Sequence, residues 1–264
     1  MDNKPLWSCV TYNFNNYELF YELPESVIND NAEYLYFSND KTLTSSTWTI
    51  VYMEGDDDPF NTVCELRYHI FDYIRSDIAV LFDGSMRPLA DLEPIVEEFN
   101  KGNYDFASII HPSRNTMYDE LYAWVQQRGM PVGNANYALQ LMASNNYDVR
   151  NYKGLFQINL MVMRRTDIVF SMQENTMKVC RILAEEGKKS FRCDQVVVSF
   201  IINRYLPMMK VMPIGQYVCG GVFFNWYVHG TDNRMLCDDR NNIEPFLFNR
   251  SVSFPYLWPK STEE

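Results

Sequence analysis

Ile78-Ala-Val-Leu-Phe82, followed at once by Asp83-Gly-Ser85, is the stretch that decides the fold. An unbroken apolar run bounded by Asp77 and Asp83 is typical of a strand that is covered on both faces of a sheet. Such strands are usually parallel and central. Because ligands bind beyond the carboxyl ends of the strands in sheets of this kind, we expect chemistry at the turn that leaves this strand.

Patterns on both sides of this run predict an alternation of strands and helices. We expect strands at 7–13, 33–37, 48–52, 106–110, 156–163 and 222–229, and helices at 61–75, 116–128, 172–186 and 194–205. The third helix should begin at a capping box, Ser171-x-x-Glu174, and stop at Gly187. The sequence therefore predicts an α/β fold in a single domain, with a mostly parallel central sheet flanked by helices.

Composition excludes several classes of function. The 264 residues are 47% hydrophobic and carry a formal net charge of -11, which favours a globular protein that repels nucleic acid and anionic membranes. A stretch long enough to span a bilayer and an N-terminal signal pattern are both missing from the sequence, so we expect a cytoplasmic protein without an integral membrane segment. The six cysteines are scattered, which favours buried thiols in a reducing compartment.

The turn Asp83-Gly-Ser85 suggests a way to hold a nucleotide diphosphate. An acidic protein can place a hard divalent cation, Mn²⁺ or Mg²⁺, between carboxylate and phosphate oxygens. Asp83 would be the first ligand, Gly84 would let the backbone approach closely, and Ser85 would add a hydroxyl. An ordinary structural turn explains the same three residues equally well.

Several motifs follow one another over about residues 45–205: Trp48-Thr-Ile50, Arg67-Tyr-His69, Asp83-Gly-Ser85, His111-Pro-Ser-Arg114 with Tyr118-Asp-Glu120, Gly154-Leu155 and Arg192-Cys-Asp-Gln195. Their order resembles the GT-A glycosyltransferases, and in particular a little-characterised glycosyltransferase-like family of plants and bacteria. Three features depart from the family pattern: Ser85 replaces the second acid of Asp-x-Asp, the lysine one turn after Arg67 is missing, and the Arg-Asp-Gln motif contains an insertion.

The resemblance implies a GT-A-like (Rossmann-like) domain over residues 1–264. Its nucleotide-binding half would span about 1–110, its acceptor and sugar half about 111–250, and a tail 251–264. It also implies a cytoplasmic enzyme of a bacterium, or of a host cell if a large DNA virus encodes it.

Several residues then become candidates for the donor site. Thr11, Tyr12 and Asn13 end the first strand and should line the nucleoside pocket. The resemblance adds His229 as a third metal ligand beside Asp83 and Ser85, although a structural histidine explains the position as well. The remaining candidates for donor binding are Arg67, Gly84, Arg114, Asn159 and Gln195. For Arg114 the alternative is a surface ion pair with Asp119 or Glu120.

Asp194 and His111 are the catalytic candidates. Glycosyl transfer needs a carboxylate, either to take the proton of the acceptor hydroxyl or to act on the opposite face of the sugar, and Asp194 suits both roles. Because Asp194 opens a predicted helix, it could instead cap that helix. His111 follows the predicted strand 106–110, at another expected strand end.

The sequence thus predicts a metal-dependent glycosyltransferase that moves a sugar from a nucleotide sugar, UDP-linked by analogy with the fold type, to a glycan or glycoprotein acceptor. One rival is a sugar nucleotidyltransferase, which usually has a Gly/Lys/Arg-rich phosphate loop that residues 11–20 do not show. The other is a non-catalytic carbohydrate- or nucleotide-binding protein on the same fold, which Ser85 in the acidic position would suit.

Overall fold

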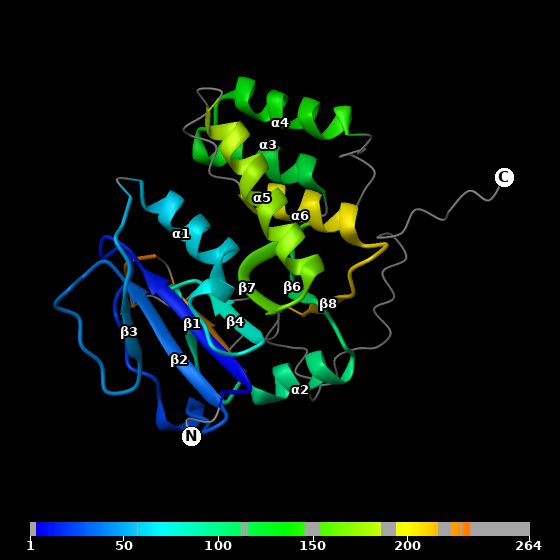
Figure 1. The fold of residues 1–264 in the computed structure, drawn as a ribbon. Coiled ribbons are helices and arrows are strands. Elements are labelled where there is room, and N and C mark those ends of the chain that lie inside the picture. Colours follow the sequence, from blue (N-terminus) through cyan, green and yellow to red (C-terminus); the bar gives the residue numbers. More distant parts are fainter. Residues whose placement is uncertain are drawn as a thin grey trace, which may run out of the picture.

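A central sheet with helices on both of its faces organises the computed structural model, which describes residues 4–56, 58–111, 114, 116–145, 154–185, 194–215, 223–227 and 229–232 (Figure 1). The seven strands lie in the order β3-β2-β1-β4-β7-β6-β8. They are β1 (Trp7–Asn13), β2 (Ala32–Ser38), β3 (Thr49–Tyr52), β4 (Ile78–Phe82), β6 (Phe106–Ile110), β7 (Phe156–Arg164) and β8 (Val211–Ile214).

Most of the sheet is parallel. β3, β2, β1 and β4 run in one direction, and β6 and β8 are parallel to each other. β7 lies between β4 and β6 and is antiparallel to both. The α/β class and the mostly parallel sheet are therefore confirmed.

The apolar run at 78–82 forms a buried strand inside the sheet, as its sequence pattern predicts. All five residues of β4 are buried, and β4 pairs with β1 on one side and β7 on the other. Every residue of β1 is buried as well. Alternate side chains of these strands enter the two separate cores on opposite faces of the sheet: Val10 belongs to one core and Cys9 to the other.

Helices divide unequally between the two faces. One core contains side chains of α1 (Pro59–Tyr68), α3 (Met117–Arg128), α4 (Val132–Ser144), α5 (Asp167–Glu185) and α6 (Asp194–Tyr205). The opposite core contains α2 (Glu93–Lys101), which lies apart from the other helices in Figure 1. Among the described helices, none is both long and apolar enough to cross a membrane.

A second, two-stranded sheet fixes the turn that leaves β4. It pairs β5 (Met86–Pro88) with β9 (Phe224–Trp226) in antiparallel register. The Asp83 amide donates to the carbonyl of Asn159 over 2.9 Å, and the Tyr227 amide donates to the carbonyl of Ser85 over 2.9 Å. Backbone hydrogen bonds to β7 and to the β9 segment thus hold residues 83–85 in place.

Some helix boundaries differ from the prediction. The capping box at Ser171 and Glu174 was wrong, because α5 begins at Asp167 and runs through both residues. The helix expected at 61–75 ends at Tyr68 and is followed by a 3-10 turn, Ile70–Asp72. Gly187 lies outside the described residues. By contrast, α3 begins at a capping box formed by Thr116 and Asp119 and ends at Gly129, whose φ is 69°.

Candidate functional site

A cleft of about 600 Å³ opens where β4 and β6 end and β7 begins. This is the edge at which open α/β sheets bind ligands. Eight of the residues singled out from the sequence line the cleft: Arg67, Asp83, His111, Arg114, Asn159, Asp194, Gln195 and His229. The cleft therefore brings together candidates that lie far apart in the chain.

Arg67 connects two of the candidate carboxylates. It comes from the last turn of α1 and is 6% exposed. Its Nη1 donates to Oδ2 of Asp194 over 2.6 Å, and its Nη2 forms an ion pair with Oδ1 of Asp83. The Tyr12 hydroxyl donates to the same oxygen of Asp83. One guanidinium thus partly compensates two carboxylates that face the same cleft.

Asp194 is held by two hydrogen bonds where α6 begins. Its Oδ1 accepts the Gln195 amide over 3.0 Å at the start of α6, while its Oδ2 accepts from Arg67. Burial raises the pKa of the Asp194 carboxyl, although the charge of Arg67 opposes this rise. Asp194 is therefore a stronger proton acceptor than an exposed carboxylate, and it is held in one orientation.

A second group of polar side chains lies on the β6 and α3 side of the cleft. Arg114 forms an ion pair with Glu120, and the indole of Trp124 donates to Glu120 over 2.9 Å. Glu120 is only 3% exposed, so this pair is not the surface ion pair that the sequence suggested as an alternative. The Arg114 amide donates to Nδ1 of His111 over 3.1 Å.

His111 is neutral near pH 7. Its burial, and then the charge of Arg114, lower the pKa of the imidazole to about 4. A pKa this low makes the ring a weak proton acceptor, and its Nδ1 already accepts the Arg114 amide, so the catalytic role of His111 stays a prediction.

The three predicted metal ligands do not form a preformed site. Asp83 Oδ1 is taken by Arg67 and Tyr12, and His229 Nδ1 contacts the carboxylate of Glu18. The Ser85 hydroxyl is buried without a hydrogen-bond partner in the described part of the chain, but Ser85 does not line the cleft. Among residues described by the structure, His, Cys, Asp and Glu form no group of three or more that could hold a metal ion. As arranged, these side chains do not fit a resident cation.

Residues at the end of β1 have structural contacts instead of lining the cleft. Thr11 is fully buried and donates to the Phe82 carbonyl over 3.0 Å. The Asn13 side chain donates to the Glu18 carbonyl over 2.6 Å. A Cβ on Gly84 would lie 2.5 Å from the Tyr12 carbonyl oxygen, so the close approach at Gly84 is to the protein's own backbone. Residues 11–13 are not among the described residues that line the cleft, and the nucleoside pocket expected there stays a prediction.

Other residues of the cleft escaped the sequence analysis. They share no motif: Tyr17 follows β1, Gln127 and Arg128 end α3, and Gln157 lies in β7. Arg128 lies in the last turn of α3, one residue before Gly129. A basic residue at the end of a predicted helix is the signal in the sequence that could have drawn attention to it. Arg192, which belongs to the motif ending at Gln195, lies outside the described residues.

Comparison with known proteins does not assign this chain to a family. No family model matches the sequence, and no curated protein matches it. The GT-A resemblance therefore stays a prediction from motifs, and the geometry of the site is the ground for a functional proposal.

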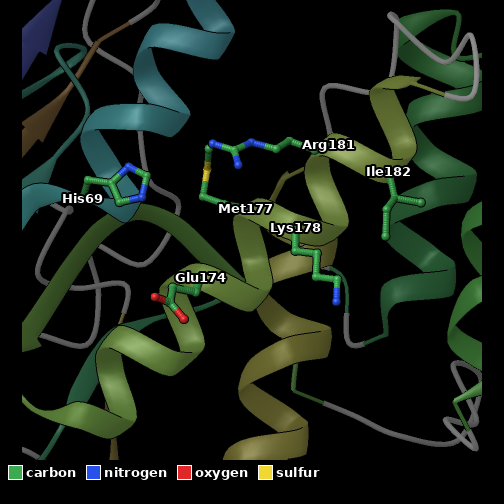
Figure 2. A pocket seen from close by; sticks show the side chains of 6 residues that line it. All are labelled: His69, Glu174, Met177, Lys178, Arg181 and Ile182. Atoms are coloured by element: carbon green, nitrogen blue, oxygen red, sulfur yellow. The ribbon is translucent and has the colours of Figure 1, made fainter.

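A second hollow, of about 530 Å³, lies on α5 (Figure 2). His69, which follows α1, faces it from one side, and the remaining lining residues all belong to α5: Glu174, Met177, Lys178, Arg181 and Ile182. The hollow contains both signs of charge, and none of the predicted site residues is among those that line it in the described part of the chain. The cleft at the strand ends is therefore the better candidate site.

Proposed function

We propose that this chain is a glycosyltransferase that moves a sugar from a nucleotide-sugar donor in the cleft at the ends of β4 and β6. The single observation that carries the proposal is the pairing of Asp83 and Asp194 with Arg67 at this edge of the sheet. Asp83 leaves β4 and Asp194 opens α6, so two acidic groups from distant segments share one open cleft. A carboxylate in such a cleft could take the proton of a hydroxyl acceptor, and this supports the proposal.

Asp194 is the proton acceptor in this proposal. Its raised pKa brings the carboxylate closer to the basicity that proton transfer from a hydroxyl needs. The hydrogen bond from Arg67 fixes one oxygen and leaves the carboxylate facing a cleft that an acceptor can enter. The proton moves from the acceptor hydroxyl to Asp194 as the hydroxyl oxygen attacks the sugar and the nucleotide leaves.

Arginine side chains supply the charge that receives the diphosphate. Arg114 and Arg128 line the same cleft as Asp83, and guanidinium groups bind phosphate oxygens through paired hydrogen bonds. Arg114 is paired with Glu120 in the free protein and would exchange this partner for phosphate. Because the predicted ligands do not fit a resident metal ion, no step is routed through Mn²⁺ or Mg²⁺.

Calorimetric titration with UDP, GDP, ADP and their glucose conjugates tests donor binding, with Mn²⁺ and with chelator in separate series. We expect one nucleotide to bind together with its sugar conjugate. Binding of none of these probes under either condition would contradict the proposal.

Turnover separates the proposed function from its rivals. With a nucleotide sugar that binds, we expect release of the free nucleoside diphosphate in the presence of a glycan or glycoprotein acceptor. Asp194→Asn should retain binding and lose about 10²- to 10⁴-fold in rate, the usual contribution of a general base. Binding without turnover would favour a carbohydrate-binding protein, and release of pyrophosphate from a sugar phosphate and a nucleoside triphosphate would favour a nucleotidyltransferase.

A further inference from the structure

β7 contains an irregularity at the floor of the cleft. Ser108 of β6 pairs with Met161, but the next residue, Ile109, pairs with Gln157. Ile158, Asn159 and Leu160 therefore have no opposite residue in β6. A bulge of this kind redirects side chains, and bulges are frequent beside active sites.

Ser108 spans the bulge from the neighbouring strand. Its hydroxyl lies 3.1 Å from the Gln157 carbonyl oxygen and 2.8 Å from the Leu160 carbonyl oxygen, one on each side of Asn159. Ser108 is fully buried, so water does not compete for this donor. The backbone on both sides of Asn159 is thus tied to one fixed point in β6.

Asn159 is placed by these contacts but has no partner for its own side chain. It is 5% exposed, and within the described part of the chain neither Nδ2 nor Oδ1 makes a hydrogen bond. Its carbonyl accepts the Asp83 amide, and the residue lines the cleft beside Asp83 and Asp194. Gln157, two residues earlier in β7, also lines the cleft and has an unpartnered Oε1.

An unpartnered buried amide is costly to a free protein, so it indicates a partner that arrives later. A primary amide offers donors on nitrogen and an acceptor on oxygen, side by side. Two neighbouring hydroxyl groups of a sugar ring can match both at once, one accepting and the other donating.

We propose that Asn159, presented by the β7 bulge that Ser108 spans, recognises a pair of neighbouring hydroxyl groups on the donor sugar. Asn159 is the residue that determines sugar specificity, and Ser108 is the positioning residue. This inference rests on the proposed function. It adds which residue contacts the sugar part of the donor.

Calorimetry with UDP, GDP, ADP and their glucose conjugates tests the inference on wild type, Asn159→Ala and Asn159→Leu. Asn203→Ala is the matched control, because Asn203 on α6 also has an unpartnered Oδ1 but does not line the cleft. We expect both Asn159 variants to weaken sugar-conjugate binding by about 10- to 30-fold and to leave the affinity for the free nucleotide unchanged, since about two neutral hydrogen bonds are lost. The control should bind like wild type.

Thermal unfolding gives a second readout that a merely structural asparagine would not produce. Because Asn159→Leu removes buried polar atoms that lack partners, we expect its midpoint to equal or exceed that of wild type. Ser108→Ala should shift the ratio of sugar-conjugate to nucleotide affinity in the same direction as Asn159→Ala.

The outcomes separate the two proposals. If wild type binds a nucleotide and its glucose conjugate but the Asn159 variants keep the wild-type affinity ratio, the inference is overturned and the proposed function stands. A lower unfolding midpoint for both Asn159 variants with an unchanged affinity ratio would assign the residue to the fold alone. If wild type binds none of the probes, the proposed function fails, and the inference fails with it.

Discussion

Arg67 donates from Nη1 to Oδ2 of Asp194 over 2.6 Å, across 127 positions of sequence. Both side chains are buried, with 8% and 9% of their surfaces exposed, and the same guanidinium also pairs with Asp83. The contact joins the end of α1 to the start of α6 on one side of the sheet. The geometry of the cleft therefore depends on the buried guanidinium of Arg67 and on its ion pairs with Asp83 and Asp194.

Removing this charge should destabilise the protein. Arg67→Met leaves two carboxylates without their shared cation, and we expect the free energy of unfolding to fall by about 3–5 kcal/mol. Urea denaturation measures the change. Arg75→Met is the control, because Arg75 is exposed and pairs with Glu33 at the surface, where a salt bridge contributes about 1 kcal/mol or less. Equal losses for the two variants would contradict this assignment.

Asp83→Asn should separate binding from folding. Arg67 keeps Asp194 as its partner, so we expect the free energy of unfolding to change by less than about 1 kcal/mol. Because Arg114 and Arg128 are proposed to hold the diphosphate, removing the negative charge of Asp83 should leave donor affinity unchanged or raise it. Calorimetry and urea denaturation check the two parts, with Asp77→Asn at the far end of β4 as the control. A loss of donor affinity would mean that Asp83 binds the diphosphate through a cation.

Divalent cations should not stabilise the protein by themselves. Asp83 is occupied by Arg67 and Tyr12, and the described side chains form no group that could hold a metal ion. We expect Mn²⁺ alone to leave the unfolding midpoint unchanged. Thermal scans with Mn²⁺ and with chelator measure the midpoint. A shift with Mn²⁺ alone would reveal a resident site that the described side chains do not provide.

His111 should make stability depend on pH. Its pKa is about 4 in the folded protein, below its ordinary 6.5, so between these values the unfolded chain binds a proton that the folded protein does not. The free energy of unfolding should therefore fall as the pH decreases from about 6.5 to about 4, by about 3 kcal/mol from this group.

His111→Asn isolates this contribution, because an asparagine oxygen can still accept the Arg114 amide. We expect the variant to lose less stability than wild type between about pH 7 and about pH 4.5, measured by urea denaturation at both values. His229 contributes with the opposite sign, since its hydrogen bond to Glu18 raises its pKa, and comparing variant with wild type removes that effect. Parallel pH profiles would refute the prediction.

Gly84→Ala tests the close backbone approach beside Asp83. The added Cβ would lie 2.5 Å from the Tyr12 carbonyl oxygen, and we expect a loss of about 1–3 kcal/mol in unfolding free energy. Gly133→Ala on α4 is a matched control, because its Cβ would meet nothing within 4 Å. That variant should gain about 0.5–1 kcal/mol by lowering the entropy of the unfolded chain. Thermal or urea unfolding distinguishes the two signs.

Segments rich in apolar residues made some elements predictable. The bounds of β1, β4, β6 and α6 agree with the expected ranges, because most residues in each are buried and leave a local pattern in the sequence. The direction of β7 was beyond sequence, since an apolar pattern does not record whether a strand runs parallel or antiparallel to its neighbours. The start of α5 was misplaced because Ser171 resembles an N-cap, although its surroundings continue the helix.

The candidate site was predictable as a set of residues and not as a set of contacts. Motif order selected Arg67, Asp83 and Asp194, but only the folded chain reveals that one guanidinium joins the two carboxylates. The strand-end rule failed for Asn13, because its side chain is used to hold the backbone of Glu18. Asn159 was selected for its polar character, whereas the bulge that gives it a distinct environment leaves no local signal in the sequence.

The position of β7 has a consequence for the way the molecule opens. In the described sheet, β7 is the strand that joins the four parallel strands ending in β4 to the pair formed by β6 and β8. Its backbone amides that are bonded to β4 or β6 can exchange with solvent only when the two parts of the sheet separate. Hydrogen exchange in β7 should therefore be among the slowest in the protein and should report the cooperativity of the whole sheet.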